Sequence, residues 1–84
     1  MLCRIVTEDL NREQVEAIVE EEFSGFTVLT GEGHWEGNKE KTLIMEIVGV
    51  NILEKIKRVA ERIKTANNQQ AVLVQVIENN DFFV

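Results

Sequence analysis

Hydrophobic and polar positions follow two kinds of pattern along the chain, and together they predict six elements. Short apolar, β-branched runs predict strands at residues 2–6, 26–30, 42–48 and 71–77. Apolar residues at three- and four-residue spacing predict one helix from Asn11 to Gly25 and a second from Asn51 to about Ala66. The expected order is strand, helix, strand, strand, helix, strand.

This order is typical of an α+β ferredoxin-like sandwich, a βαββαβ chain whose antiparallel sheet carries both helices on one face. The 84 residues leave room for one domain, residues 1–84. The strand expected at residues 71–77 is apolar on both faces apart from Gln75. Because two helices cover only one face, we expect the other face to be buried between subunits of an oligomer.

Turn signals mark the ends of these elements. Asn11 with Gln14, and Asn51 with Glu54, have the spacing of a capping box at a helix start. Residues 31–39 are rich in glycine and polar side chains. They predict a long turn, so that the two middle strands form a hairpin with an enlarged loop.

The charge pattern excludes some classes of partner. Nine Lys and Arg against fifteen Asp and Glu give a net charge of −6, which repels phosphate backbones and argues against nucleic-acid binding. The expected first helix is acidic and the second basic, so their rims should attract each other. The single cysteine, Cys3, suits a reducing compartment, and no apolar run reaches the length of a membrane span. We therefore expect a cytoplasmic protein with no membrane or signal segment.

The segment from Thr30 to Thr42 is the richest in candidate chemistry. Its three glycines permit turns whose successive backbone amides form an anion-binding nest. Lys39 and Lys41 would add positive charge for a phosphate or a carboxylate. The glycine spacing is not that of a dinucleotide-binding fingerprint, and a flexible hairpin loop remains the alternative.

Two side chains in this segment raise further alternatives. Trp35 predicts packing against a ligand, against another subunit or against the chain's own sheet. His34 could serve as a general base, or as a metal ligand with Glu32, Glu36 or Glu40. One histidine among acids is a poor metal signature, so we expect a solvated or interfacial His34 and no metal site. Cys3 is expected to be a buried apolar filler.

The motifs Gly25-Phe26-Thr27-Val28, Gly31-x-Gly33-x-Trp35-x-Gly37 and Glu40-Lys41-Thr42 resemble those of short bacterial and phage members of the PII-like superfamily. The resemblance covers most of the chain, with its specific motifs in residues 25–42. It implies a homotrimer that binds nucleotides or other small anionic metabolites in clefts between subunits. The residues it places at the cleft are Thr30, Gly31, Gly33, Trp35, Gly37, Lys39, Glu40 and Lys41, and His34 is a further candidate. The chain lacks the tyrosine of the signalling members and has a shorter loop.

Within the same superfamily, Leu29-Thr30-Gly31 and Glu40-Lys41-Thr42 resemble segments of phage S-adenosylmethionine lyases. This resemblance implies trimers with sites between subunits, in which Glu40 would be the catalytic glutamate. It also implies an aromatic hydroxyl near the position of His34 or Trp35, and the chain has no tyrosine.

The sequence therefore predicts a homotrimer that binds a small anionic, nucleotide or adenosyl ligand, without a further cofactor, as a sensor or sequestering protein. An S-adenosylmethionine lyase and a structural trimer without ligand are the alternatives. The apolar C-terminal residues 82–84 are expected either to dock on a neighbour or to fray.

Overall fold

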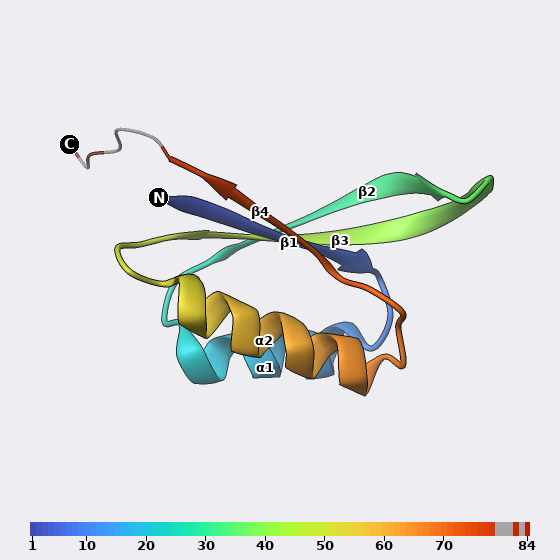
Figure 1. Cartoon of the computed structure of the whole chain (residues 1–84), viewed down its shortest axis with the longest axis horizontal. Coiled ribbons are helices and arrows are strands. Elements are labelled where there is room, and N and C mark those ends of the chain that lie inside the picture. The colour runs from blue at the N-terminus through green and yellow to red at the C-terminus, as the bar shows by residue number, and fades with distance from the viewer. Residues whose placement is uncertain (79–81, 83) are drawn as a thin grey trace.

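The computed structural model describes residues 1–78, 82 and 84, and all six predicted elements are present in the predicted order. They are β1 (Leu2–Glu8), α1 (Arg12–Glu22), β2 (Thr27–Trp35), β3 (Asn38–Val48), α2 (Leu53–Ala66) and β4 (Leu73–Ile77). The four strands form one sheet in the order β2-β3-β1-β4, with every neighbouring pair antiparallel. Both helices lie against the same face of this sheet (Figure 1). The α+β class is thus confirmed, and the arrangement is compatible with a ferredoxin-like sandwich.

The hydrophobic core lies between the sheet and the two helices. Alternate residues of β1 and β3 point toward the helices, because successive side chains of a strand face opposite sides. The fully buried side chains of these strands include Cys3, Ile5, Leu43 and Met45. Helix α2 contributes Ile56, Val59, Ala60 and Ile63, and helix α1 contributes Val15, Ile18 and Val19. The opposite face of the sheet, called the open face below, carries no helix.

The starts of both helices differ from the predicted capping boxes. Asn11 and Asn51 have φ of 50° and 55°, in the left-handed region, and neither helix start has a side-chain cap hydrogen bond. A capping side chain needs an extended backbone at the cap residue, so these asparagines turn the chain instead. Helix α1 also ends earlier than predicted, because the extended and buried Phe23 leaves the helix before Gly25.

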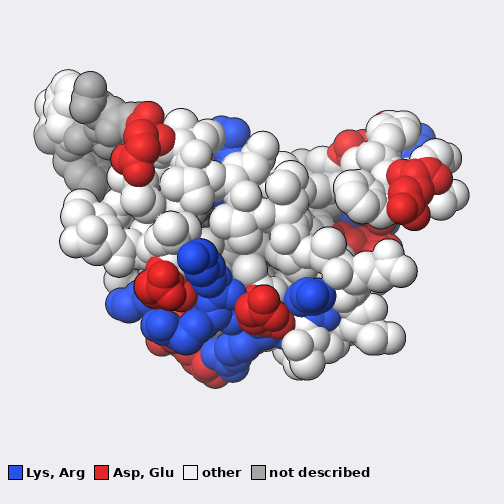
Figure 2. Space-filling model, viewed as in Figure 1, with Lys and Arg blue, Asp and Glu red and all other residues white. Residues whose placement is uncertain are grey.

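The predicted attraction between the helices is confirmed. Arg62 of α2 pairs with Glu21 of α1, and Arg58 Nη2 lies 3.5 Å from Glu22 Oε2. Basic and acidic side chains intermingle over the helical layer in Figure 2. Such solvated pairs contribute little to the stability of the fold.

The connection between β2 and β3 is shorter than predicted, so the prediction of a long turn was wrong. Both strands continue to a two-residue turn, Glu36–Gly37, and their pairing runs from Thr27 opposite Glu46 to Trp35 opposite Asn38. Glu36 and Gly37 have φ of 49° and 78°, and positive φ at both positions is the mark of a type I′ hairpin turn. Pairing with β3 holds β2 extended despite the weak strand preference of glycine.

Candidate functional site

The candidate site is a groove at the end of the sheet where β1 stops. Pairing of β1 with β3 ends at Glu8 opposite Thr42, so the β2–β3 ribbon projects beyond β1 (Figure 1). Strand β4 begins only at Leu73, opposite Val6. The space between the ribbon and the connection that leads into β4 has a volume of about 940 Å³.

Five of the nine predicted ligand residues line this groove. They are Gly31, Gly33, His34, Trp35 and Glu40. The other four, Thr30, Gly37, Lys39 and Lys41, are exposed and are not part of the lining. The structure therefore gathers the glycine and aromatic part of the predicted site and leaves its lysines outside.

The predicted anion-binding nest is not formed. Gly31 and Gly33 lie in extended β2, opposite Thr42 and Glu40, whereas a nest needs a turn conformation. Lys39 Nζ lies 3.1 Å from Glu32 Oε1, in an ion pair on the exposed ribbon. Gly31 and Gly33 therefore keep backbone atoms close to the groove without forming the predicted nest.

Residues of the open face form the floor of the groove. Thr42 of β3 lies between Gly31 of β2 and Glu8 of β1, and Gly33 lies opposite Glu40. A Cβ placed on Gly33 would lie only 2.3 Å from Thr42 Oγ1. The hydroxyl of Thr42 therefore occupies the space that a side chain at position 33 would take.

The charge of the groove is negative. Glu8, Glu32, Glu36 and Glu40 border it, and none of its described lining residues is a lysine or an arginine. Acidic side chains also mark the projecting ribbon in Figure 2. A groove lined by charges of one sign attracts ligands of the opposite charge. This groove therefore favours a cationic or neutral group over a phosphate.

Apolar surface flanks the groove at both ends. Trp35 stands near the ribbon tip with 61% of its surface exposed, so it is not buried against the chain's own sheet. Ile44, Val6 and Leu73 lie at the other end, in one row across β3, β1 and β4. The aromatic or aliphatic part of a ligand can therefore contact apolar side chains on either side of the acidic floor.

A segment of four carboxamide side chains forms the wall facing the ribbon, and our sequence analysis assigned it no role. This segment is Asn67, Asn68, Gln69 and Gln70. Thr7 Oγ1 donates a hydrogen bond of 2.5 Å to Gln69 Oε1. The run of four amides in the sequence was the available signal, because such side chains both donate and accept hydrogen bonds.

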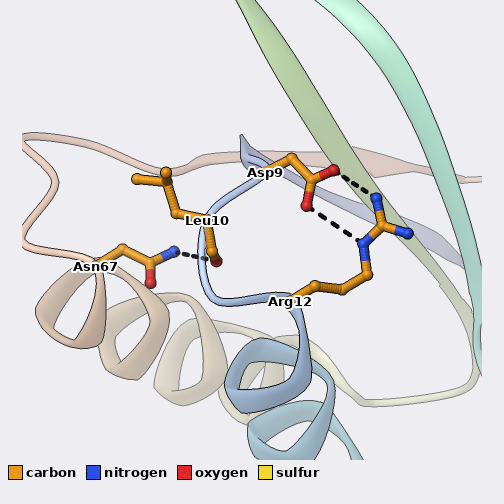
Figure 3. A network of polar contacts seen from close by, with 4 residues as sticks. All are labelled: Asp9, Leu10, Arg12 and Asn67. Carbon is orange, nitrogen blue, oxygen red and sulfur yellow. Dashed lines mark hydrogen bonds and ion pairs between the residues drawn. The ribbon is translucent and has the colours of Figure 1, made fainter.

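This wall is tied to the connection between β1 and α1. Asn67 Nδ2 donates to the carbonyl oxygen of Leu10 at 3.3 Å, as Figure 3 shows. In the same view Arg12 donates two hydrogen bonds to the carboxylate of Asp9. These hydrogen bonds from Arg12 lower the pKa of Asp9. Leu10 borders the groove, so these contacts fix one of its edges.

Two further candidates from the sequence are Cys3 and His34. Cys3 is fully buried, as predicted, and burial raises the pKa of its thiol. His34 Nε2 lies 3.3 Å from Glu32 Oε2 on the exposed ribbon. Within the described ranges, no three His, Cys, Asp or Glu side chains are arranged to hold a metal ion. Neither α1 nor α2 is long and apolar enough to cross a membrane.

Searches against known protein families and against curated protein sequences find no match for this chain.

Proposed function

We propose that this protein is a small-molecule-binding module that acts as a PII-like homotrimer, serving as a sensor or a sequestering protein. The observation that carries this proposal is the groove itself. It combines an exposed tryptophan and a glycine floor on the β2–β3 ribbon with a carboxamide wall on the connection between α2 and β4. A concave surface with an aromatic wall and a few placed polar groups is the usual form of a ligand site.

The open face supports the trimer. Leu29, Ile44, Val6 and Leu73 form one apolar row across all four strands, and Val48, Leu2 and Ile77 form another. Between the rows, Arg4 Nε lies 2.6 Å from Glu46 Oε2. Exposed apolar rows of this extent are typical of an interface. The first row runs into the groove, so a neighbouring subunit on this face would lie beside the ligand.

Among the expected ligands, the acidic floor favours an adenosyl compound over a nucleotide. Adenine would stack on Trp35 and offer hydrogen-bonding edges to the carboxamide wall. The phosphates of a nucleotide would face Glu8 and Glu40 with no lining lysine or arginine to compensate.

One observation favours an S-adenosylmethionine lyase as a second candidate. Glu40, the residue that the resemblance makes catalytic, lies half-buried in the groove floor next to Thr42. Incubation with S-adenosylmethionine, followed by chromatography for methylthioadenosine, tests this candidate. Product formation by the native protein would establish the enzyme, and its loss in Glu40→Gln at saturating S-adenosylmethionine would assign the catalytic role to Glu40. Absence of product at high protein concentration would leave the binding module.

Ligand binding can be followed through Trp35, the only tryptophan of the chain. We expect adenosine to change its fluorescence in a saturable way. Calorimetry should then show weaker binding by Trp35→Ala and unchanged binding by Val50→Ala, which removes an exposed side chain outside the groove. No saturable change with adenosine or with adenine nucleotides would contradict the proposal.

Sedimentation tests the assembly. We expect three times the 9.6 kDa chain mass at micromolar concentration. Leu73→Lys, on the open face, should lower this mass, whereas Val50→Lys should not, although Val50 is more exposed than Leu73. A native monomer would contradict the trimer.

A further inference from the structure

The hydroxyl of Thr42 is the best-placed polar group that the fold leaves without a partner. Thr42 is 9% exposed and borders the groove. Among the described residues its hydroxyl makes no hydrogen bond, whereas the other buried threonine, Thr7, donates to Gln69. Among the described residues no fully buried side-chain oxygen or nitrogen lacks a partner, so the Thr42 hydroxyl is open to the groove and available to a ligand.

Two carboxylates flank this hydroxyl. Glu8 lies directly opposite Thr42 across the β1–β3 pair, and Glu40 lies two residues along β3 on the same face. Glu8 and Glu40 are therefore diagonal neighbours, whose backbones lie roughly 7–8 Å apart in an antiparallel pair. On the other side, Gly31 and Gly33 have no side chains to fill the space. The result is a small depression with oxygen atoms on its floor and rim.

We propose that this depression, formed by Glu8, Thr42 and Glu40 over Gly31 and Gly33, binds the ammonium group of the ligand. An ammonium group has three N–H donors and no acceptor, and the three side chains offer three acceptors. Hydrogen bonds between an ammonium and carboxylates are charge-assisted and short. This inference rests on the proposed function and names the charged part of the ligand that the groove takes.

The same geometry favours an organic cation over an anion or a metal ion. A phosphate or a carboxylate would lie between two glutamates without a compensating lysine in the lining. A bound metal ion would need closely converging ligands, and the described residues include no such group. An ammonium on a ligand body fits both the spacing and the apolar row of Val6 and Ile44 next to it.

Three adenosine compounds that differ only at the 5′ position test the inference by calorimetry. They are 5′-amino-5′-deoxyadenosine, which is cationic, adenosine, which is neutral, and adenosine monophosphate, which is anionic. We expect the amine to bind about tenfold more tightly than adenosine, because a hydrogen bond to a charged group contributes at least that much affinity. Glu8→Gln and Glu40→Gln should each reduce this tenfold preference for the amine over adenosine, because each removes one charged acceptor.

Thr42→Val should weaken binding of the amine, and Thr42→Ser, which keeps the hydroxyl, should restore it. Glu20→Gln, which removes an exposed charge from α1, is the matched control and should bind all three compounds like the native chain. Equal affinity of the native protein for the amine and for adenosine would overturn the subsite and leave the proposed function intact. Failure of all three compounds to bind would overturn both.

Discussion

The hydroxyl of Thr42 and the bare Cα of Gly33 occupy adjoining positions on the open face, so close that a methyl group on Gly33 would lie 2.3 Å from Thr42 Oγ1. Gly31, two residues earlier on the same strand, has nothing within 4 Å of the corresponding position. Both glycines are extended, so the difference between them is one of space and not of backbone conformation.

Gly33→Ala should therefore destabilise the protein, whereas Gly31→Ala should not. The added methyl forces Thr42 out of its rotamer, and a β-branched side chain is stiff at χ1. We expect a loss of about 1–2 kcal/mol in the free energy of unfolding for Gly33→Ala. Chemical denaturation of both variants measures this loss, and equal stability of the two would contradict the packing argument.

Glu36→Asn should stabilise the hairpin. Glu36 is held at a φ of 49° in the two-residue turn before Gly37. A non-glycine residue pays a steric cost there, and asparagine pays less of it, which is why Asn-Gly is the preferred type I′ sequence. We expect a gain of about 0.5–1 kcal/mol in the free energy of unfolding. Glu20→Asn, inside α1, is the control and should lower stability instead.

The spacing of hydrophobic residues predicted all six elements, because residues that pack against one core recur with the period of their helix or strand. Leu43, Met45 and Ile47 alternate along β3, and Ile56, Ala60 and Ile63 follow helical spacing, as the buried faces require. The errors lie where pairing or backbone turns override local preference. The extension of β2 through Gly31 and Gly33 depends on β3. An asparagine such as Asn11 suits both a helix cap and a left-handed φ, so the residue type alone did not decide between the two.

The candidate site was predicted in part for the same reason. Trp35, Gly33 and Glu40 belong to one continuous ribbon, so proximity in sequence placed them together. The carboxamide wall and Glu8 come to the groove from distant segments through the sheet order and the β4 connection.

Of the apolar C-terminal residues 82–84, Phe82 and Val84 are exposed, and Phe83 lies outside the described residues.

The ion pair of Asp9 with Arg12 should make stability depend on pH on the acidic side. The hydrogen bonds from Arg12 hold the folded-state pKa of Asp9 below its ordinary value of 3.8. The pair therefore contributes stability above that value, and the contribution is lost as the pH falls through the lowered pKa. The stability difference between the native chain and Asp9→Asn should shrink as the pH falls below 3.8. A difference that stays constant with pH would contradict this assignment, and Glu20→Gln controls for overall charge.

Cys3 should react slowly with thiol reagents while the protein is folded. Its side chain is fully buried, and burial raises the pKa of the thiol, so little reactive thiolate is present at neutral pH. We expect rapid reaction with a disulfide reagent in denaturant and a rate at least about a hundredfold lower without it, since reaction requires opening of the sheet. A native rate close to the denatured rate would show that β1 opens readily at its N-terminal end.

The hydrogen bond from Thr7 to Gln69 should stabilise the wall of the groove. Both Thr7 and Thr42 are buried, but only the Thr7 hydroxyl has a partner among the described residues. Thr7→Val removes a donor at nearly constant volume and should cost about 1 kcal/mol, a fall of about 4–8 °C in melting temperature for a domain of this size. Thr42→Val is the matched control and should change the melting temperature less, because it breaks no hydrogen bond within the chain. Amide hydrogen exchange should show faster opening of residues 67–70 in Thr7→Val, whereas unchanged protection there would mean that Asn67 alone, through Leu10, holds the wall.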